Sequence, residues 1–78
     1  MDKKGTLNRR VGVNLRRIRI AQGVGQEAYA QVLGWDRTYV GGLERGERNL
    51  TLDTLEELAE RVGVDPLELL RGVGDARS

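Results

Sequence analysis

Apolar residues recur every three or four positions along this sequence, in short segments that are separated by glycines. In the first segment Leu7, Val11, Leu15 and Ile18 follow one another at steps of four, four and three residues, which places all of them on one face of a helix. Alternation between apolar and polar residues is not sustained and β-branched residues are scattered, so the sequence gives no strand signal. The pattern therefore predicts an all-α fold.

Boundary residues divide the chain into five expected helices. Asp36, Thr51 and Asp65 are good N-cap residues, because their side-chain oxygens accept hydrogen bonds from the free N–H groups of a first turn. Glycines at 23, 34 and 63 are expected to end helices. The expected helices cover roughly residues 7–22, 26–33, 37–45, 52–62 and 66–71. The fourth is expected to bury an apolar stripe formed by Leu52, Leu55, Leu58, Ala59 and Val62.

Composition excludes several classes of function. A chain of 78 residues builds one small core, and the absence of cysteine and histidine removes disulfides, thiolate metal sites and the usual general base. No paired acids, phosphate-binding glycine loop or metal-ligand spacing is present, so we expect no catalytic activity, no cofactor and no metal. No apolar run suits a membrane span or a signal peptide, which favours a cytoplasmic location. Residues 6–71 are expected to form one domain, with flexible ends at 1–5 and 72–78.

Charge is unevenly distributed, although the net charge is only +1. Residues 1–50 carry ten Lys and Arg against five Asp and Glu, whereas residues 51–78 carry three against seven. A basic half favours a polyanionic partner such as nucleic acid. The alternative is a solvated charged surface without such a partner.

Residues 26–33 and 36–45 are two short helical segments joined by a tight turn that contains Gly34. This arrangement fits a helix-turn-helix. Ala30 is small enough to let the second helix cross closely over the first, and Val40 and Leu43 are expected to hold the pair to the core. The start of the second helix then stays outside, where it can enter a DNA major groove roughly 12 Å wide.

Over about residues 8–71 the sequence resembles the phage-repressor and Cro-like helix-turn-helix family. The residues that carry this resemblance are LRRIR at 15–19, GVGQE at 23–27, Ala30, LG at 33–34, Val40, LERG at 43–46, Leu55, Ala59 and VGV at 62–64. Within the family, DRTYV at 36–40 followed by ERGERNLT at 44–51 is most similar to the controller proteins of restriction-modification systems. The resemblance implies a five-helix, lambda-repressor-like DNA-binding domain. It also implies a homodimeric transcription regulator with a palindromic operator, on which two dimers can assemble.

Candidate DNA-binding residues lie on and beside the 37–45 helix. The resemblance implies that Arg37 reads a base, and its two donors match the O6 and N7 atoms of guanine. Thr38 can contact a thymine methyl group or a phosphate, and Tyr39 can contact the backbone. The resemblance also implies a phosphate contact at Gln26, where a helix N-terminus attracts anions. Residues that flank the exit of the helix are expected to clamp the DNA backbone: Arg45, Arg48 and Asn49.

Each of these residues also has a structural interpretation. The arginines and Asn49 can be solvated surface groups, Tyr39 can simply pack, and Gln26 can cap its own helix. The resemblance implies that Arg19 and Glu44 form a structural salt bridge between the first and third helices. Tyr29 is expected to fill core volume with its hydroxyl at the rim.

Two consecutive glycines inside the third helix are unusual, because each costs roughly 1 kcal/mol relative to alanine. We expect Gly41 and Gly42 to lie on the outward face of the helix. One interpretation is that the backbone approaches DNA closely there. Another is that the middle of the helix reads few bases and leaves specificity to Arg37, Thr38 and DNA shape. A third is a slightly frayed helix, and the sequence leaves all three open.

The fifth segment carries more leucine than one short helix buries in its own domain. Val64, Leu67, Leu69 and Leu70 are therefore expected to form an exposed apolar patch at a two-fold dimer interface. The alternative is that the leucines complete the monomer core.

The predicted function is a sequence-specific, double-stranded DNA-binding transcription regulator, with no membrane partner and no small-molecule ligand. The alternative is an antitoxin-like or adaptor module that binds another protein on the same fold. The basic and polar character of Arg37, Thr38, Arg45 and Arg48 favours DNA.

Overall fold

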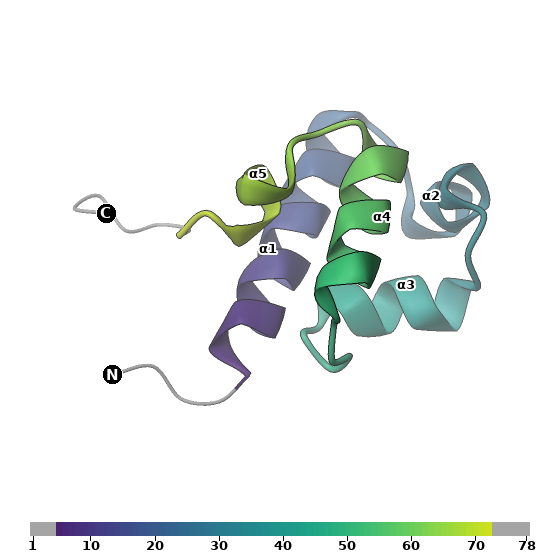
Figure 1. Ribbon diagram of the computed structural model, residues 1–78. Coiled ribbons are helices and arrows are strands. Elements are labelled where there is room, and N and C mark those ends of the chain that lie inside the picture. Colours follow the sequence, from purple (N-terminus) through teal and green to yellow (C-terminus); the bar gives the residue numbers. More distant parts are fainter. Residues whose placement is uncertain (1–4, 73–78) are drawn as a thin grey trace.

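The computed structural model describes residues 5–72, and these form five helices and no strand. The helices are α1 (Thr6–Ala21), α2 (Gln26–Leu33), α3 (Arg37–Glu44), α4 (Leu52–Val62) and α5 (Pro66–Leu70) (Figure 1). The all-α prediction is confirmed, and each expected helix is present. Most of the residues expected at the two ends, 1–4 and 73–78, lie outside the described residues.

Three helices begin at the N-cap residues that the sequence indicates. Asp36 accepts a hydrogen bond from the Thr38 N–H at 2.9 Å, and the Thr51 hydroxyl accepts one from the Thr54 N–H at 3.1 Å. Asp65 accepts one from the Leu67 N–H at 2.8 Å. Each bond satisfies a backbone donor that a first helical turn leaves free.

Gly34 ends α2 in the left-handed conformation, with a φ of 75°. Glycine adopts this conformation without the steric cost that a Cβ brings. The N–H of Gly34 and the N–H of Trp35 both donate to the carbonyl of Ala30, at 2.9 and 3.0 Å. The chain therefore turns sharply between α2 and α3.

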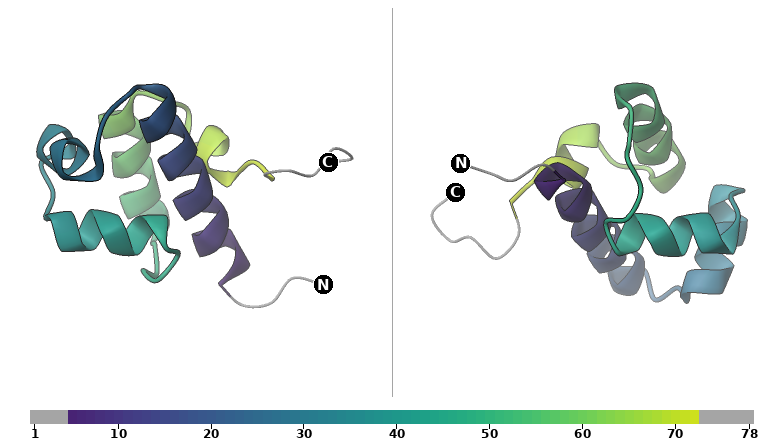
Figure 2. Two further views of the ribbon diagram at one scale, coloured as in Figure 1. Left: turned by 180° about the vertical axis from the view of Figure 1, so that it is seen from behind. Right: turned by 90° about the horizontal axis from the view of Figure 1, so that it is seen from below.

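The core is almost entirely aliphatic. α1 packs against α3 and α5, while α2 packs against α3 and α4, and α5 also packs against α4. Figures 1 and 2 show the carboxyl end of α3 directed towards the side of α1. The buried hydrophobic residues come from all five helices: Val11, Leu15, Tyr29, Ala30, Leu33, Val40, Leu43, Leu55, Leu58, Ala59 and Leu69.

Two leucines that were expected on buried stripes are exposed. Leu52 is 81% exposed and Leu7 is 54% exposed. Leu52 is the first residue of α4, and Leu7 lies in the first turn of α1. Helical spacing places both on the apolar faces, and both line one open hollow together with Val11, Leu55 and Leu70.

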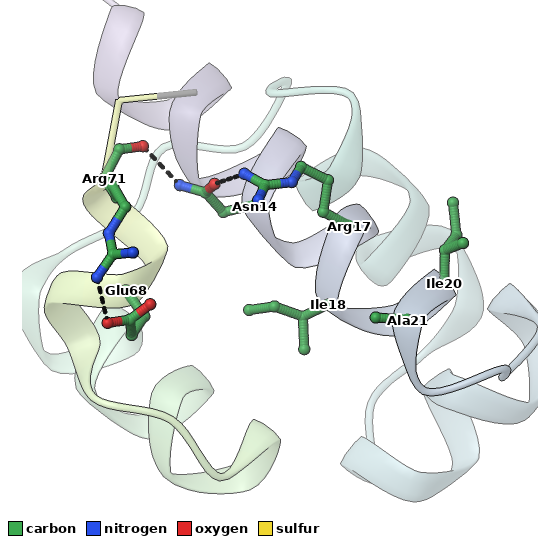
Figure 3. A pocket seen from close by; sticks show the side chains of 7 residues that line it. All are labelled: Asn14, Arg17, Ile18, Ile20, Ala21, Glu68 and Arg71. Carbon is green, nitrogen blue, oxygen red and sulfur yellow. Dashed lines mark hydrogen bonds and ion pairs between the residues drawn. The ribbon is translucent and has the colours of Figure 1, made fainter. Parts of the chain in front are cut away.

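Asn14 is a buried polar residue on the inner side of α1. Its Nδ2 donates to the carbonyl of Leu69 at 2.8 Å and to the carbonyl of Arg71 at 2.9 Å, so it holds the carboxyl end of α5 (Figure 3). Its Oδ1 accepts from Arg17 Nη1 at 3.2 Å. All of its polar groups thus have partners, which removes the cost of burying them.

Leu69 does not belong to an exposed patch. The prediction that it lies at a dimer interface is wrong, because its exposed fraction is 0% and it forms part of the monomer core. Asn14 draws the backbone of Leu69 onto α1, and the side chain follows it into the interior. Leu67 remains 72% exposed, while Val64 and Leu70 are half-buried.

Candidate nucleic-acid interface

α2 and α3 form two packed helices joined by the three-residue turn 34–36. Ala30, on α2, is buried at this contact, and Val40 and Leu43 anchor α3 in the core. Seen from below in the right view of Figure 2, the ribbon of α3 lies at the front of the molecule. One face of α3 is thus held by the core, and the other is available to a partner.

Arg19 and Glu44 form the ion pair that the resemblance implies. Arg19 Nε lies 2.6 Å from Glu44 Oε2, and the side chains are only 11% and 4% exposed. Arg19 Nη2 donates to Glu44 Oε1 at 3.1 Å, and Nη1 donates to the carbonyl of Val24 at 2.9 Å. The hydrogen bond to Glu44 raises the pKa of the Arg19 guanidinium, against the opposing effect of burial. This pair fixes the end of α3 against α1.

Gln26 joins the same network. Its Nε2 donates to Glu44 Oε1 at 3.0 Å. The side chain therefore links the first residue of α2 to the last residue of α3, and it makes no capping bond to its own helix. The N-cap of α2 is Gly25, which offers no side-chain oxygen to the first N–H groups.

Tyr29 differs from the expectation in one respect. Its ring is in the core as expected, but its hydroxyl is buried and has no hydrogen-bond partner. Burial raises the pKa of this hydroxyl; the nearby Glu44 carboxylate raises it further, and the Arg19 charge lowers it. The hydroxyl is thus within the electrostatic influence of the buried Arg19–Glu44 pair and is not at the rim.

The amino-terminal end of α3 carries Arg37 and Thr38, and both are exposed. Arg37 Nη1 lies 2.5 Å from Glu27 Oε2, and both side chains are well exposed to solvent. An exposed pair of this kind adds little stability. Arg37 can therefore exchange Glu27 for another hydrogen-bond acceptor at small cost.

Arg45 and Asn49 flank the carboxyl end of α3. Arg45 Nε lies 3.0 Å from Glu47 Oε1 in a second exposed pair. Asn49 Oδ1 accepts from Asn8 Nδ2 at 3.1 Å, and Asn8 Oδ1 accepts from the Leu50 N–H at 3.4 Å. Through Asn8, α1 thereby holds the loop that comes after α3 in the chain.

Tyr39 takes part in a row of two adjacent aromatic rings with an arginine at each end. Its ring meets the Trp35 ring edge-on, with the centroids 5.4 Å apart and the planes at 83°. The Arg48 guanidinium carbon lies 5.3 Å from the centroid of Tyr39, and that of Arg61 lies 5.1 Å from the centroid of Trp35. Arg61 also donates to the carbonyl of Leu33. The row runs from α4, across the turn, to the loop after α3.

Gly41 and Gly42 face away from the core, as expected, but both are buried because polar surface side chains lie over them. A Cβ built on Gly41 would lie 3.1 Å from Arg45 Nη1 and 3.6 Å from Gln26 Oε1. A Cβ built on Gly42 would lie 2.9 Å from Arg48 Nε. Flexible polar side chains cover these glycines. Arg48 comes from the loop after α3, so helical spacing gives no sign of its cover over Gly42.

Gly12 also has a part in the site that sequence reasoning missed. A Cβ on Gly12 would lie 2.6 Å from the carbonyl oxygen of Glu44 and closer still to that of Leu43. The absence of a side chain therefore lets α1 touch the backbone of α3. The signal in the sequence was a glycine in the middle of a helix. Such a glycine lowers helix stability, so its presence suggests close packing against a neighbour.

Asn8 and Arg61 were not singled out from the sequence either. Nothing in their spacing separates them from other surface polar residues, because their partners lie 41 and 28 positions away along the chain. Among residues 5–72 there is no group of His, Cys, Asp and Glu arranged to hold a metal ion. None of the helices described is long and apolar enough to cross a membrane.

Two packed helices joined by a glycine turn, the second with a polar outer face, define a helix-turn-helix protein. The chain belongs to this family: the protein-family model described as Helix-turn-helix matches residues 15–69. The sequence is 41% identical over 61 residues to control protein C.SmaI of Serratia marcescens, covering 78% of this chain and 73% of that protein.

Solved structures agree with this assignment. The restriction-modification controller protein C.AhdI from Aeromonas hydrophila matches with a TM-score of 0.68 at 44% identity, covering 80% of this chain and 94% of that one. The restriction-modification controller protein C.Esp1396I, as a tetramer in complex with its natural 35 base-pair operator, matches with a TM-score of 0.69 at 32% identity, covering 85% and 97%.

Proposed function

We propose that this protein is a sequence-specific, double-stranded DNA-binding transcription regulator, and that it is the controller protein of a restriction-modification system. The observation that carries the proposal is the outer side of α3, which exposes Arg37 and Thr38 at one end and Arg45 and Arg48 at the other. The similarity to C.SmaI and C.AhdI and the operator complex of C.Esp1396I support the same function.

Arg37 reads a base in this proposal. In the free protein its guanidinium is paired with Glu27, and DNA binding replaces this carboxylate by the O6 and N7 atoms of guanine. Breaking the Arg37–Glu27 pair costs little free energy because both side chains are exposed. The new acceptor must still match the geometry of the guanidinium. Thr38 and Tyr39 complete the contact at the same end of α3.

Phosphate contacts position the domain. The first N–H groups of α2 receive no side-chain cap from Gly25, so they can bind a phosphate oxygen with the help of the helix dipole. Gln26 adds its amide at the same end, and Arg45, Arg48 and Asn49 hold the backbone at the other end of α3. Such contacts make the affinity fall steeply with salt concentration.

A homodimer places two α3 helices on a palindromic operator. The proposed interface consists of Leu67, which is largely exposed, together with the half-buried Val64 and Leu70. Leu69 is excluded from it because it is fully buried within the monomer. A two-fold arrangement sets the half-sites about one helical turn apart. We further propose that two such dimers bind one operator and that the concentration of the protein controls its occupancy. The proposed location is the cytoplasm.

In-vitro selection from a random duplex library tests the proposal. We expect enrichment of a palindrome with half-sites about one turn apart. Arg37→Ala should relax the preference at one position of each half-site and weaken binding by about 5-fold to 150-fold for each half-site, the value of one good bidentate contact.

Arg17→Ala is the matched control, because it removes the same charge from the pocket between α1 and α5 (Figure 3). It should leave the base preference intact. If no sequence is enriched even at low salt, DNA recognition by this protein is excluded, and a protein partner becomes the better explanation of the exposed residues.

A further inference from the structure

The two glycines of α3 are buried beneath arginine side chains. Gly41 lies one turn before Arg45, and side chains of a helix lean towards its amino terminus, so Arg45 covers Gly41. Its Nη1 is 3.1 Å from the place where a Cβ on Gly41 would be. Arg48 reaches back from the following loop and covers Gly42 in the same way.

The aliphatic part of the Arg48 side chain lies against Gly42, as does its Nε atom. A Cβ on Gly42 would lie 2.9 Å from Nε, 3.2 Å from Cγ and 3.5 Å from Cδ of Arg48. Real Cβ atoms almost never approach a neighbour as closely as 2.9 Å, so an alanine at this position must shift the Arg48 side chain. At Gly41 the nearest atom is the tip of Arg45, which can swing aside.

The Tyr39 ring provides the second wall around Arg48. Tyr39 precedes Gly42 by three residues and thus lies on the same side of α3. The Arg48 guanidinium carbon is 5.3 Å from the ring centroid, a distance at which the ring attracts a cation. The edge-on contact with Trp35, which Arg61 covers, holds the ring in turn.

We infer that Gly42 and Tyr39 form a cradle that positions Arg48 for DNA binding, so that Gly42 is a positioning residue that sets DNA affinity although it contacts no DNA itself. The middle of α3 presents no long side chain of its own, and the guanidinium of Arg48 occupies that place. The inference rests on the proposed function, because it concerns how one of the proposed DNA contacts is set.

A different explanation of the same glycine is close approach of the α3 backbone to DNA. The two explanations differ in what Gly42→Ala does when Arg48 is already absent. In a cradle, the added methyl group acts only by moving Arg48, so its effect disappears in the Arg48→Ala background. In close approach, the methyl group meets DNA directly and its effect persists.

A double-mutant cycle on the selected operator separates these cases. We expect Gly42→Ala and Arg48→Ala each to weaken binding by about tenfold, and the double variant to be less than about twofold weaker than Arg48→Ala alone. Gly41→Ala is the matched control, with the same chemical change one residue away, and should stay within about threefold of the unmodified protein. The melting temperature of Gly42→Ala should not fall, because alanine favours a helix over glycine.

The free protein provides a second readout that does not depend on DNA binding. The Nε–H proton of Arg48 should show an upfield ring-current shift in the NMR spectrum, and Tyr39→Leu should abolish it. The cradle is overturned if Gly42→Ala still weakens DNA binding in the Arg48→Ala background. It is also overturned if the Arg48 Nε–H proton shows no ring-current shift. If the unmodified protein selects no DNA sequence, the proposed function fails instead, and the NMR result still decides whether the cradle exists.

Discussion

At the scale of single residues, Tyr29 carries a buried polar group that lowers the stability of the folded state. Its hydroxyl is the one side-chain polar atom in the described part of the chain that is both buried and without a hydrogen-bond partner. Burying a hydroxyl in this way costs free energy, because the bonds it made to water are not replaced. The ring nevertheless fills core volume beside the Arg19–Glu44 pair.

We expect Tyr29→Phe to raise the free energy of unfolding by about 1 kcal/mol at pH 7, because it removes the unsatisfied group and keeps the ring. The raised pKa of the hydroxyl adds a pH dependence. The folded state favours the neutral form, so this contribution is complete below pH 10 and is lost as the pH rises through the folded pKa. Urea unfolding at pH 7 and above pH 10 measures both effects.

The Phe variant should lack the alkaline loss that the hydroxyl causes. Tyr39→Phe is the control, since that tyrosine is half-buried at the surface. A Tyr29→Phe protein that is less stable than the unmodified one at pH 7 would show that the hydroxyl has a partner, for which a buried water is the natural candidate.

At the scale of elements, the contact between α1 and α3 decides how the recognition helix is held. Gly12 lets the two helices touch along their backbones, and the Arg19–Glu44 pair joins them again two turns further along α1. One of these features is steric and the other electrostatic. Both belong to the same helix pair, so α3 is fixed in position and in rotation.

Gly12→Ala should lower the free energy of unfolding by about 2–3 kcal/mol, because the added Cβ meets backbone atoms that cannot move aside. Helix propensity alone predicts the opposite sign, a gain of about 1 kcal/mol. Urea denaturation gives the value.

Gly25→Ala is the matched control for Gly12→Ala, since nothing lies within 4 Å of its Cβ position. Because Gly25 is the N-cap of α2 and alanine is a poorer cap, its cost should stay below about 1 kcal/mol. Equal stabilities of the Gly12→Ala variant and the unmodified protein would mean that α1 and α3 separate without cost.

At the scale of the whole molecule, α5 has two separate tasks. Leu69 completes the monomer core, held there by Asn14, whereas Leu67 is directed to solvent. Two leucines two positions apart on a helix point to different sides, so one short helix serves both the interior and the proposed interface.

This division predicts opposite results for two similar substitutions. Leu67→Ala should weaken self-association, measured by sedimentation, with little change in the stability of the monomer. Leu69→Ala should lower the free energy of unfolding by about 2–5 kcal/mol, the usual cost of a leucine-to-alanine change in a core. Unchanged association of Leu67→Ala would exclude Leu67 from the dimer interface.

The sequence determined the helices and most of their ends. Apolar spacing and caps such as Asp36 and Thr51 act over a few residues, so their effects are visible in a local pattern. The sequence also indicated which helix faces a partner and placed Arg37 and Thr38 on it, although their contacts with DNA remain predictions. The family resemblance supplied the pairing of Arg19 with Glu44.

Only the tertiary structure decided what covers each residue. Leu52 and Leu69 have the apolar character of core residues, yet one is exposed and the other is buried, because coverage depends on where neighbouring helices end. The burial of Gly42, the unpaired hydroxyl of Tyr29 and the backbone contact at Gly12 likewise arise from segments that are distant in sequence. Local patterns fix a helix and its faces, but helix packing sets the depth, the cover and the partners of each side chain.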